Sequence, residues 1–384
     1  FQNKALISAT PIVPEKDSRF DGFMRVLIQP DYVYRQKLKL ITTNNVLETL
    51  QEVIEAKRGT VCIFCNSIDS IDSFYRLIPE LSNACTFCSE DGQYKLWKGN
   101  RRKKSMMITE LERYNFFTSR FYSAVDILCK NPPHVIFVSD LYGAAQSVID
   151  PATEAIQIIG RFRGGVNSVT HIASIRPELE CMSSSEIDHW IQGASTIFNG
   201  WKAQLARTTN IGERTLLQEA IGENSYLPYL DENGKPDSFL IANFYEKEQV
   251  KRLYTSADLL HLAYEQTGYF VFSHEERLMP VSDNERMAIQ HRLAKKKRAE
   301  LIVRKLEEME KMSKATDKKI QKRYQRMLMN LITSTADRYI YDCFCRFGAE
   351  FVREADYNEN KLRTALNVSS EHTIKKSGQM RTYI

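Results

Sequence analysis

The chain lacks the sequence patterns by which several large classes of protein are recognised. No apolar run among its 384 residues approaches the ~18 residues of a membrane-spanning helix, and its first residues lack the charged and then apolar pattern of a secretory signal. It contains no His-Glu-x-x-His motif of metalloproteases and no Gly-x-Ser-x-Gly turn of serine hydrolases. A Gly-x-x-x-x-Gly-Lys-Ser/Thr phosphate loop and an acidic magnesium-binding box are also absent. We therefore do not expect this sequence to hydrolyse a nucleoside triphosphate by itself.

The composition is that of an ordinary folded protein. Hydrophobic residues make up 43% of the chain and charged residues 26%, which is usual for globular domains. The 53 basic and 48 acidic residues give a net charge of +5, which is compatible with nucleic-acid binding but does not argue for it. The length suffices for two or three domains. Without a span or a signal, we expect a cytoplasmic protein with no membrane partner, and the oligomeric state is not predicted.

Four of the eight cysteines have the spacing of a zinc ribbon, with Cys62 and Cys65 as one Cys-x-x-Cys pair and Cys85 and Cys88 as the other. The surroundings of the first pair argue against a metal. Residues 60–65 form a continuous apolar, β-branched run typical of a buried strand, and strand positions three apart point to opposite faces. We predict reduced core cysteines and no metal. A zinc-dependent DNA-binding protein is the less favoured alternative.

Residues 44–173 alternate helix and strand signals. Asn45 followed by Glu48 is a capping-box pattern, and a helical apolar face comes after it. Asp150 followed by a proline is another helix start, with the aspartate as cap and the proline in the first turn. Strands are predicted at residues 60–65, 84–87, 114–118, 135–138 and 168–173. Strands separated by helices indicate an α/β fold with a parallel sheet flanked by helices.

Beyond about residue 174 the sequence becomes mainly helical. An apolar stripe from Ile187 to Trp201 recurs at three- and four-residue steps, and we expect it to be core. Residues 284–326 predict a long helix or a helix pair. Its stretch from 291 to 326 carries 14 Lys and Arg against 5 Asp and Glu, a local net charge of +9. This basic helix could bind DNA or RNA through counterion release, or it could be a solvated strut.

A second basic stretch interrupts the alternating region. Residues 95–104 contain six cations, among them Arg101 and Arg102, and one aromatic residue, Trp97. The cations could lie along a phosphate backbone while the indole stacks on a base. The other interpretation is a solvated surface loop.

The most informative motif combines a glycine with two arginines. Gln157, Gly160 and Arg161 form Gln-x-x-Gly-Arg, and Arg163 follows two positions later. Guanidinium groups are permanently charged and present a rigid fork of donors to phosphate oxygens. The motif therefore suits a site that neutralises a polyphosphate.

Two further motifs precede this one. Thr118 and Asp126 lie eight positions apart, and residues 8–11 read Ser-Ala-Thr-Pro. In this order the three segments resemble motifs III, V and VI of superfamily 2 helicases and translocases. The resemblance covers about residues 1–173 and implies a RecA-like sheet that carries motif IV as well. Two departures are Ala124, where the family usually has glycine, and Arg163, which lies one place before the family's usual second arginine.

The resemblance implies a role for each motif residue. Those assigned to ATP hydrolysis are the catalytic Arg161, Arg163 and Gln157 and the nucleotide-binding Asp126 and Gly160. Those assigned to a bound nucleic-acid strand are Thr118, Ser119, Asn66, Arg101 and Arg102. Those assigned to coupling hydrolysis to lobe movement are Ser8 and Thr10. We expect the two arginines to lie at the carboxyl edge of the sheet, where a neighbouring lobe would deliver the triphosphate.

The resemblance also implies how the chain is divided. The expected parts are the end of a first motor lobe (1–15), a second RecA-like lobe (16–173), a helical accessory region (174–283), and a basic long helix with C-terminal helices (284–384). In the family, the phosphate loop and magnesium box belong to the first lobe. We therefore expect ATP with Mg²⁺ to be bound mainly by an N-terminal RecA-like lobe that this chain lacks. The expected function is ATP-dependent movement on nucleic acid, DNA rather than RNA; the alternative is an inactive nucleic-acid-binding or scaffolding module that uses the basic helix.

Overall fold

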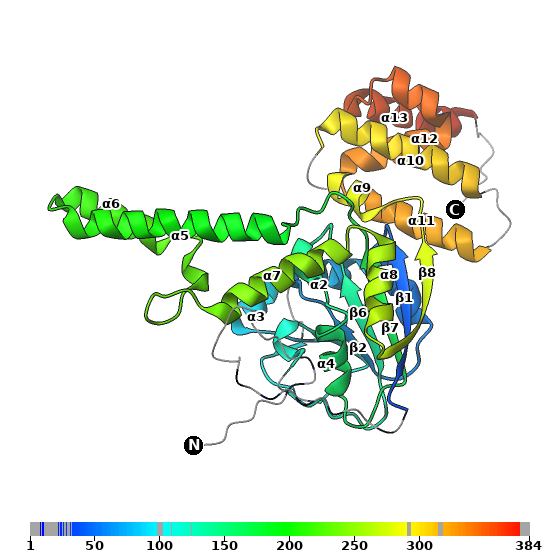
Figure 1. Ribbon diagram of the computed structural model, residues 1–384. Helices are drawn as coiled ribbons and strands as arrows, with labels where there is room; N and C mark the ends of the chain where they lie inside the picture. The colour runs from blue at the N-terminus through cyan, green and yellow to red at the C-terminus, as the bar shows by residue number, and fades with distance from the viewer. Residues whose placement is uncertain are drawn as a thin grey trace.

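One sheet of eight strands organises the chain up to residue 277 (Figure 1). The computed structural model describes residues 33–97, 103–108, 110–123, 125–289, 293–313 and 318–376, with single positions 8, 10, 22, 24, 26, 28 and 31 before them. The strands are β1 (Gln36–Thr43), β2 (Val61–Phe64), β3 (Cys85–Phe87), β4 (Lys103–Ser105), β5 (Tyr114–Phe117), β6 (His134–Ser139), β7 (Ser168–Ser174) and β8 (Phe270–Arg277). Their order is β4-β3-β5-β2-β6-β7-β1-β8, and all neighbouring strands are parallel.

Helices flank this sheet and make up the C-terminal region. Those up to residue 266 are α1 (Val46–Glu55), α2 (Ile68–Leu77), α3 (Glu90–Trp97), α4 (Glu154–Gly160), α5 (Ser184–Arg207), α6 (Ile211–Gly222), α7 (Ser238–Leu253) and α8 (Ala257–Gln266). Those after β8 are α9 (Asp283–Met287), α10 (Lys295–Ser313), α11 (Lys318–Leu331), α12 (Thr335–Glu354) and α13 (Glu359–Lys376). Among the described helices, none combines the length and the apolar character needed to cross a membrane. The predicted α/β class, with a parallel sheet, flanking helices and a mainly helical C-terminal region, is confirmed.

The helices cover both faces of the sheet. Side chains of α1, α2 and α3 share one hydrophobic cluster with the sheet, and those of α4, α7 and α8 share the other, in front of the sheet in Figure 1. β2 lies in the middle, with Ile63 in the first cluster and Phe64 in the second. A strand buried on both faces needs apolar residues at every position, which explains the continuous apolar run of its sequence.

The sheet also separates the paired cysteines. Cys62 and Cys85 belong to one cluster and Cys65 and Cys88 to the other, and all four are buried free thiols. Each Cys-x-x-Cys pair is therefore divided between the two faces, as the alternation of a strand requires. Burial raises the pKa of the Cys88 thiol to about 11, and a protonated thiol is a poor metal ligand.

The sheet extends past the boundary expected at residue 173. The five predicted strands are present as β2, β3, β5, β6 and β7, whereas β1, β4 and β8 were not predicted. β8 lies in the region expected to be helical and pairs with β1 along eight residues. α7 and α8 also pack on the sheet. Residues 238–277 thus belong to the α/β domain.

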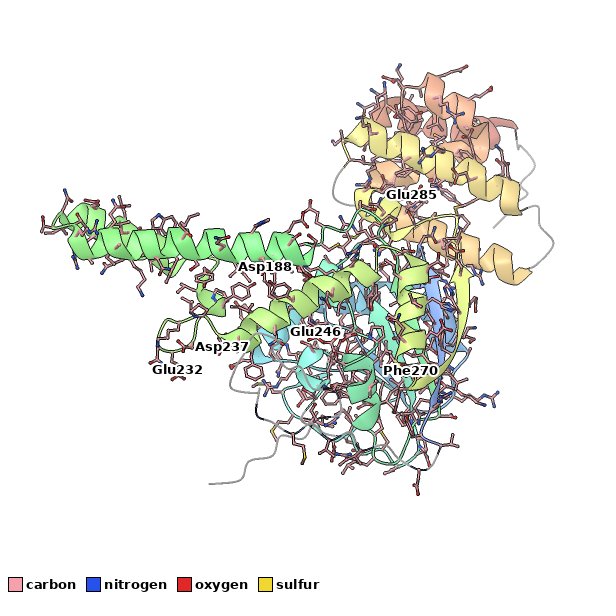
Figure 2. All side chains as sticks on the ribbon, in the orientation of Figure 1. Asp188, Glu232, Asp237, Glu246, Phe270 and Glu285 are labelled. Carbon is pink, nitrogen blue, oxygen red and sulfur yellow. The ribbon has the colours of Figure 1, made fainter. Side chains whose placement is uncertain are left out.

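α5 and α6 form an arm that projects from this domain (Figure 1). α5 has 24 residues, about 36 Å at the usual helical rise, and α6 folds back along it. At the base, Trp190 packs on Phe244 with ring centroids 5.4 Å apart. Asp188, labelled near the start of α5 in Figure 2, accepts a hydrogen bond from Tyr245 (2.5 Å). Farther out Ile197 is 52% exposed. The predicted apolar stripe is therefore core at its base but not along its whole length.

The C-terminal helices have a hydrophobic core of their own. Its buried side chains come from Met279 onward, and in the described part of the chain no buried residue before Met279 belongs to it. The basic stretch forms the helix pair α10 and α11 rather than one long helix. Among the described residues of this stretch, six cations make ion pairs within the protein. These are Lys296, Arg298, Arg304, Lys305, Arg323 and Arg326.

Candidate functional site

The carboxyl ends of three adjacent strands, β5, β2 and β6, bring two predicted residues together. Asn66 follows β2 and Ser119 follows β5; the backbone N–H of Ser119 lies 3.4 Å from Asn66 Oδ1. The Asn66 amide also approaches the carbonyl of Gln146, in the loop after β6, at 3.5 Å. The chain leaves β2 for α2 on one face of the sheet and leaves β5 and β6 for the other face. Parallel sheets bind ligands at such divergence points.

Thr118 does not present its hydroxyl to solvent at these strand ends. Its side chain donates to the Phe87 carbonyl (3.4 Å), and only 9% of the residue is exposed. The neighbouring Ser119 and Arg120 are both exposed. We did not predict Arg120, although a cation directly after a serine that follows a strand could have indicated it. The strand ends thus offer Asn66, Ser119 and Arg120 to a phosphate backbone, since amide, hydroxyl and guanidinium donors are the usual phosphate ligands.

The ATP-assigned residues gather in a second polar group. Gln157, on α4, donates through Nε2 to Thr10 Oγ1 (2.5 Å), and the Arg163 guanidinium pairs with Asp126 (3.0 Å). Arg161 donates through Nε to the Gln157 carbonyl (3.0 Å). The backbone carbonyl of Arg161 also accepts from the N–H of Ile127, next to Asp126 (2.9 Å). Three segments that are far apart in the sequence therefore meet around the two arginines.

This group lies beside the face of the sheet that α4 covers. α4 starts from the loop that leaves the carboxyl end of β6 and runs back before β7 begins parallel to β6. Phe162, between the two arginines, packs on Phe64, the last residue of β2 (ring centroids 6.1 Å apart). The chain reaches the amino edge at Asn167, whose N–H donates to the Pro133 carbonyl just before β6 (2.8 Å). The expected position of Arg161 and Arg163 at the carboxyl edge stays a prediction.

The remaining assigned residues contribute little to either group. Ser8 is exposed and accepts a hydrogen bond from the Thr10 N–H (3.1 Å). Gly160 is exposed, and a methyl group there would meet no atom within 4 Å, so no close packing requires glycine at this position. Arg101, Arg102, Trp97's side chain and Ala124 lie outside the described residues.

A second divergence point, between β1 and β7, is closed by the C-terminal domain. Asp283, which begins α9, accepts from the Val46 N–H (2.5 Å) and pairs with Arg286 (2.9 Å). Beside them, Asp140 accepts from Ser70 Oγ (2.9 Å). Burial and the nearby Asp283 raise the pKa of Asp140 to about 6, although Arg286 opposes this. Because this polar cluster is buried, the exposed groups at the carboxyl ends of β5, β2 and β6 are the better candidate for a ligand site.

Ser139 and His171 form a hydroxyl–imidazole pair that is not a nucleophilic site. Ser139 Oγ lies 3.1 Å from His171 Nε2, and the Tyr264 hydroxyl lies 2.8 Å from Nδ1. Both Ser139 and His171 are fully buried. Burial lowers the pKa of His171 to about 3, so the imidazole is neutral at physiological pH. The pair links β6 and β7 to α8 as part of the core.

Glu154 gives a pH-dependent prediction at the start of α4. Burial raises its pKa from the usual 4.5 to about 7, although the Asp150 N–H donates to it (3.0 Å) and opposes the rise. The folded state therefore keeps this proton up to about pH 7, whereas the unfolded state loses it near 4.5. The contribution of Glu154 to the free energy of unfolding is therefore fully present below pH 4.5 and is lost as the pH rises through 7.

Glu154→Gln should remove that loss. We expect the variant to be about 1–2 kcal/mol more stable than the wild type at pH 8 and nearly equal to it at pH 4.5. Denaturant unfolding at the two pH values measures the difference. An equal stability difference at both pH values would contradict the assignment.

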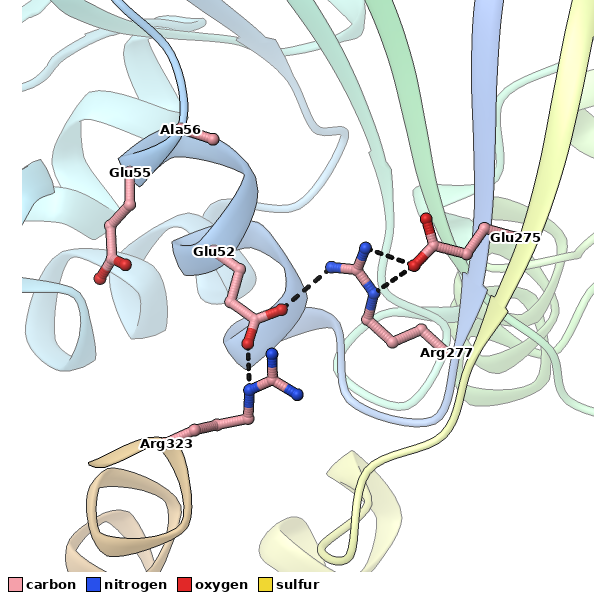
Figure 3. Close-up of a pocket in the computed structure, with 6 residues that line it drawn as sticks. All are labelled: Glu52, Glu55, Ala56, Glu275, Arg277 and Arg323. Atoms are coloured by element: carbon pink, nitrogen blue, oxygen red, sulfur yellow. Dashed lines mark hydrogen bonds and ion pairs between the residues drawn. The ribbon is translucent and has the colours of Figure 1, made fainter. Parts of the chain in front are cut away.

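A hollow in the described part of the protein lies away from both polar groups. It has a volume of ≈ 620 Å³ and is lined by Glu52, Glu55, Ala56, Glu275, Arg277 and Arg323 (Figure 3). Its charges are already paired: Arg277 contacts Glu52 (3.0 Å) and Glu275 (2.5 Å). It lies between α1, β8 and α11, at the junction with the C-terminal domain.

Comparison of the chain with protein-family models and with curated proteins finds no match.

Proposed function

We propose that this chain contains the second RecA-like motor lobe of an ATP-dependent nucleic-acid helicase or translocase of superfamily 2. The observation that carries the proposal is the meeting of Thr10, Asp126, Gln157, Arg161 and Arg163, from three separate motifs, in one polar group. Nothing in the spacing of these motifs along the chain requires them to meet. Their meeting is expected if they act together on one ligand.

The arginines are suited to reach a nucleotide held elsewhere. Arg163 is 63% exposed and Asp126 47%, and an ion pair this exposed contributes little net free energy. A triphosphate with greater negative charge could therefore take the guanidinium from Asp126.

In this proposal, ATP with Mg²⁺ is held mainly by another RecA-like lobe. Arg161 and Arg163 bind phosphate oxygens and stabilise the negative charge of the transition state, which is the role of finger arginines in related NTPases. Gln157 orients the attacking water or contacts phosphate. Asp126 holds Arg163 until the nucleotide arrives.

The nucleic-acid strand would lie across the carboxyl ends of β5, β2 and β6. Asn66, Ser119 and Arg120 would bind its phosphates there, with DNA as the expected strand. One sheet would then carry both the strand and the arginines that reach the nucleotide, so that a movement of the lobe displaces both. The reduced cysteines fit the expected cytoplasmic location.

The competing functions have less support. A module that binds nucleic acid through its basic helix alone leaves unexplained why residues of three motifs meet in one polar group. A zinc-dependent protein needs its cysteines on one side of the sheet, yet each pair is divided between the two faces.

The proposal is tested by ATP hydrolysis in a protein that joins this chain to a lobe with a phosphate loop and acidic box. We expect hydrolysis that single-stranded DNA stimulates, and a loss of that stimulation in Ser119→Ala/Arg120→Ala. Glu232→Ala, in an exposed loop far along the chain, is the control and should retain it. Hydrolysis that nucleic acid never stimulates would refute the proposed motor.

A further inference from the structure

α1 and α11 face each other with complementary charges. Glu48, Glu52 and Glu55 recur on α1 at spacings of four and three, which places them on one side of the helix. From α11, Arg323 pairs with Glu52, and Arg326 pairs with Glu48 and with Glu55 (3.1 Å). We call these five residues the α1–α11 zipper.

The zipper continues into the sheet. Glu52 also pairs with Arg277 of β8 (3.0 Å), which in turn pairs with Glu275 (Figure 3). Glu275 also pairs with Lys39. The whole network contains four carboxylates and four cations. Its charge is therefore balanced, and the arginines of α11 find on α1 the negative charge that a phosphate backbone would otherwise supply.

The contact between the two domains is polar, which suits a reversible association. The C-terminal core is separate from both clusters of the sheet. The domains are joined by hydrogen bonds between the β1–α1 turn and residues 279–283, such as Asn44 to the Met279 carbonyl (2.8 Å), and by the zipper. Ion pairs weaken with salt, and domains joined without a shared hydrophobic interface are expected to move.

The closed zipper leaves one group unsatisfied. Glu48 is 1% exposed, and its Oε2 has no hydrogen-bond partner. Burial of an unpaired carboxylate oxygen costs free energy. Burial also raises the pKa of Glu48 even though Arg326 lowers it. The arginines, in contrast, remain about a quarter exposed, at 27% for Arg323 and 26% for Arg326. A competing anion can therefore approach them from solvent.

The distribution of charge favours nucleic acid as that anion. Residues 283–384 carry 23 basic and 14 acidic residues, a net charge of +9, whereas residues 1–282 carry 30 basic and 34 acidic, a net charge of −4. A domain this basic attracts a polyanion over distances of about a Debye length. The attraction pulls the C-terminal domain toward the strand and away from the acidic face of α1.

We propose that the α1–α11 zipper is a latch that covers a second nucleic-acid-binding surface, in which Arg323 and Arg326 bind backbone phosphates once they leave the α1 carboxylates. The inference rests on the proposed function, because it takes the same ligand. It adds a binding surface on the C-terminal domain and a contact within the chain that restrains it.

The test weakens the latch without removing its arginines. In the full chain, Glu52→Gln/Glu55→Gln frees Arg323 and removes one partner of Arg326. Binding of a labelled single-stranded DNA, followed by fluorescence anisotropy between about 50 and 200 mM salt, should tighten about threefold, and the slope of log affinity against log salt should steepen by about 0.7 per added phosphate contact. Adding Arg323→Gln to this variant should return both quantities toward the wild-type values.

Glu223→Gln/Glu232→Gln is the matched control. Both residues are exposed and lie outside the network, so the variant makes the same change in net charge and should bind DNA as the wild type does. An equal gain in the control would overturn the latch. So would an unchanged affinity of a folded Glu52→Gln/Glu55→Gln, judged by its melting curve. If that variant fails to fold, Glu55→Gln alone, whose side chain is 39% exposed, replaces it and must still show a gain.

The proposed motor function and the proposed latch can be refuted independently of each other. If DNA-stimulated hydrolysis is found but the affinity does not respond to the latch variants, only the latch is refuted. If the affinity responds but no joined protein hydrolyses ATP, the motor is refuted and the second binding surface remains.

Discussion

Replacing Arg163 with alanine is expected to lower ATP hydrolysis by about a thousandfold or more in a protein that joins this chain to a phosphate-loop lobe, because finger arginines contribute about 10³–10⁵ to the rate in related NTPases. Arg163 is the more exposed of the two arginines, and its only described partner is the half-exposed Asp126. It can therefore change partner without breaking a buried contact.

Arg161→Ala should also lower the rate of ATP hydrolysis, but partly for a structural reason. Its Nε–H is bonded to the carbonyl of Gln157 within the same helix turn, so part of its guanidinium orients α4 while the rest is available to phosphate. Arg163→Lys should stay closer to Arg163→Ala than to the wild type, because an ammonium group cannot reproduce the planar fork of donors.

Steady-state hydrolysis with saturating single-stranded DNA measures these rates. Arg207→Ala, an exposed arginine at the end of α5, is the control and should leave the rate unchanged. Unchanged rates in both Arg161→Ala and Arg163→Ala would eliminate the finger role, whatever the affinity for DNA.

The parts of the fold that could be predicted from the sequence are those with locally complete signals. β2 and β6 are apolar at nearly every position because both of their faces are buried, and such runs are recognisable without knowing their partners. β1 and β8 were missed because they lie toward one edge of the sheet, where Lys37, Lys39, Glu275 and Glu276 can stand among apolar residues. Their pairing joins segments more than 200 residues apart, which no local pattern indicates.

The candidate site was predicted in its members but not in its geometry. Motif spacing identified Gln157 and Asp126 as residues of one site, yet it could not show that Thr10 and Arg163 are their immediate partners. α4 also begins at Glu154 rather than at Pro151, because Asp150 uses its carboxylate to hold the preceding turn.

The contacts of the C-terminal domain could not be predicted from the sequence, for a different reason. A run of cations has the same sequence signature whether it faces solvent, nucleic acid or carboxylates. Only the fold shows that Arg326 meets Glu48, which lies 278 positions earlier. The proposed latch can therefore be inferred only from the tertiary structure. In that proposal, the α1 carboxylates and a phosphate backbone compete for the arginines of α11.

The second large effect is expected at Tyr254, which joins the end of α7 to the segment that leads into α4. Its hydroxyl donates to the carbonyl of Ile149 (2.7 Å) and accepts from the N–H of Ile149 (2.9 Å) and from Ser139 Oγ (3.1 Å). Tyr254, Ile149 and Ser139 are all fully buried. Tyr254→Phe therefore leaves the buried N–H and carbonyl of Ile149 without this partner, and it removes one of the two contacts of Ser139 Oγ, which keeps His171 Nε2.

We expect Tyr254→Phe to destabilise the protein by about 3 kcal/mol, since each unsatisfied buried group costs about 1–3 kcal/mol and some relaxation is available. At about 2–4 °C per kcal/mol for a domain of this size, the melting temperature should fall by about 6–12 °C. The matched control is Tyr264→Phe, which removes one hydroxyl from the same core and only its contact with His171 Nδ1. It should cost about 1 kcal/mol.

Hydrogen exchange distinguishes the intended cause from a general loss of stability. The Ile149 amide loses its acceptor in Tyr254→Phe but keeps it in Tyr264→Phe, so only the first variant should exchange faster there under native conditions. Because Ile149 leads directly into Asp150 and α4, faster exchange should extend toward Gln157, and hydrolysis by the joined protein should fall in parallel. Equal melting temperatures for the two variants, or unchanged exchange at Ile149, would mean that this hydroxyl does not anchor the helix that carries the arginines.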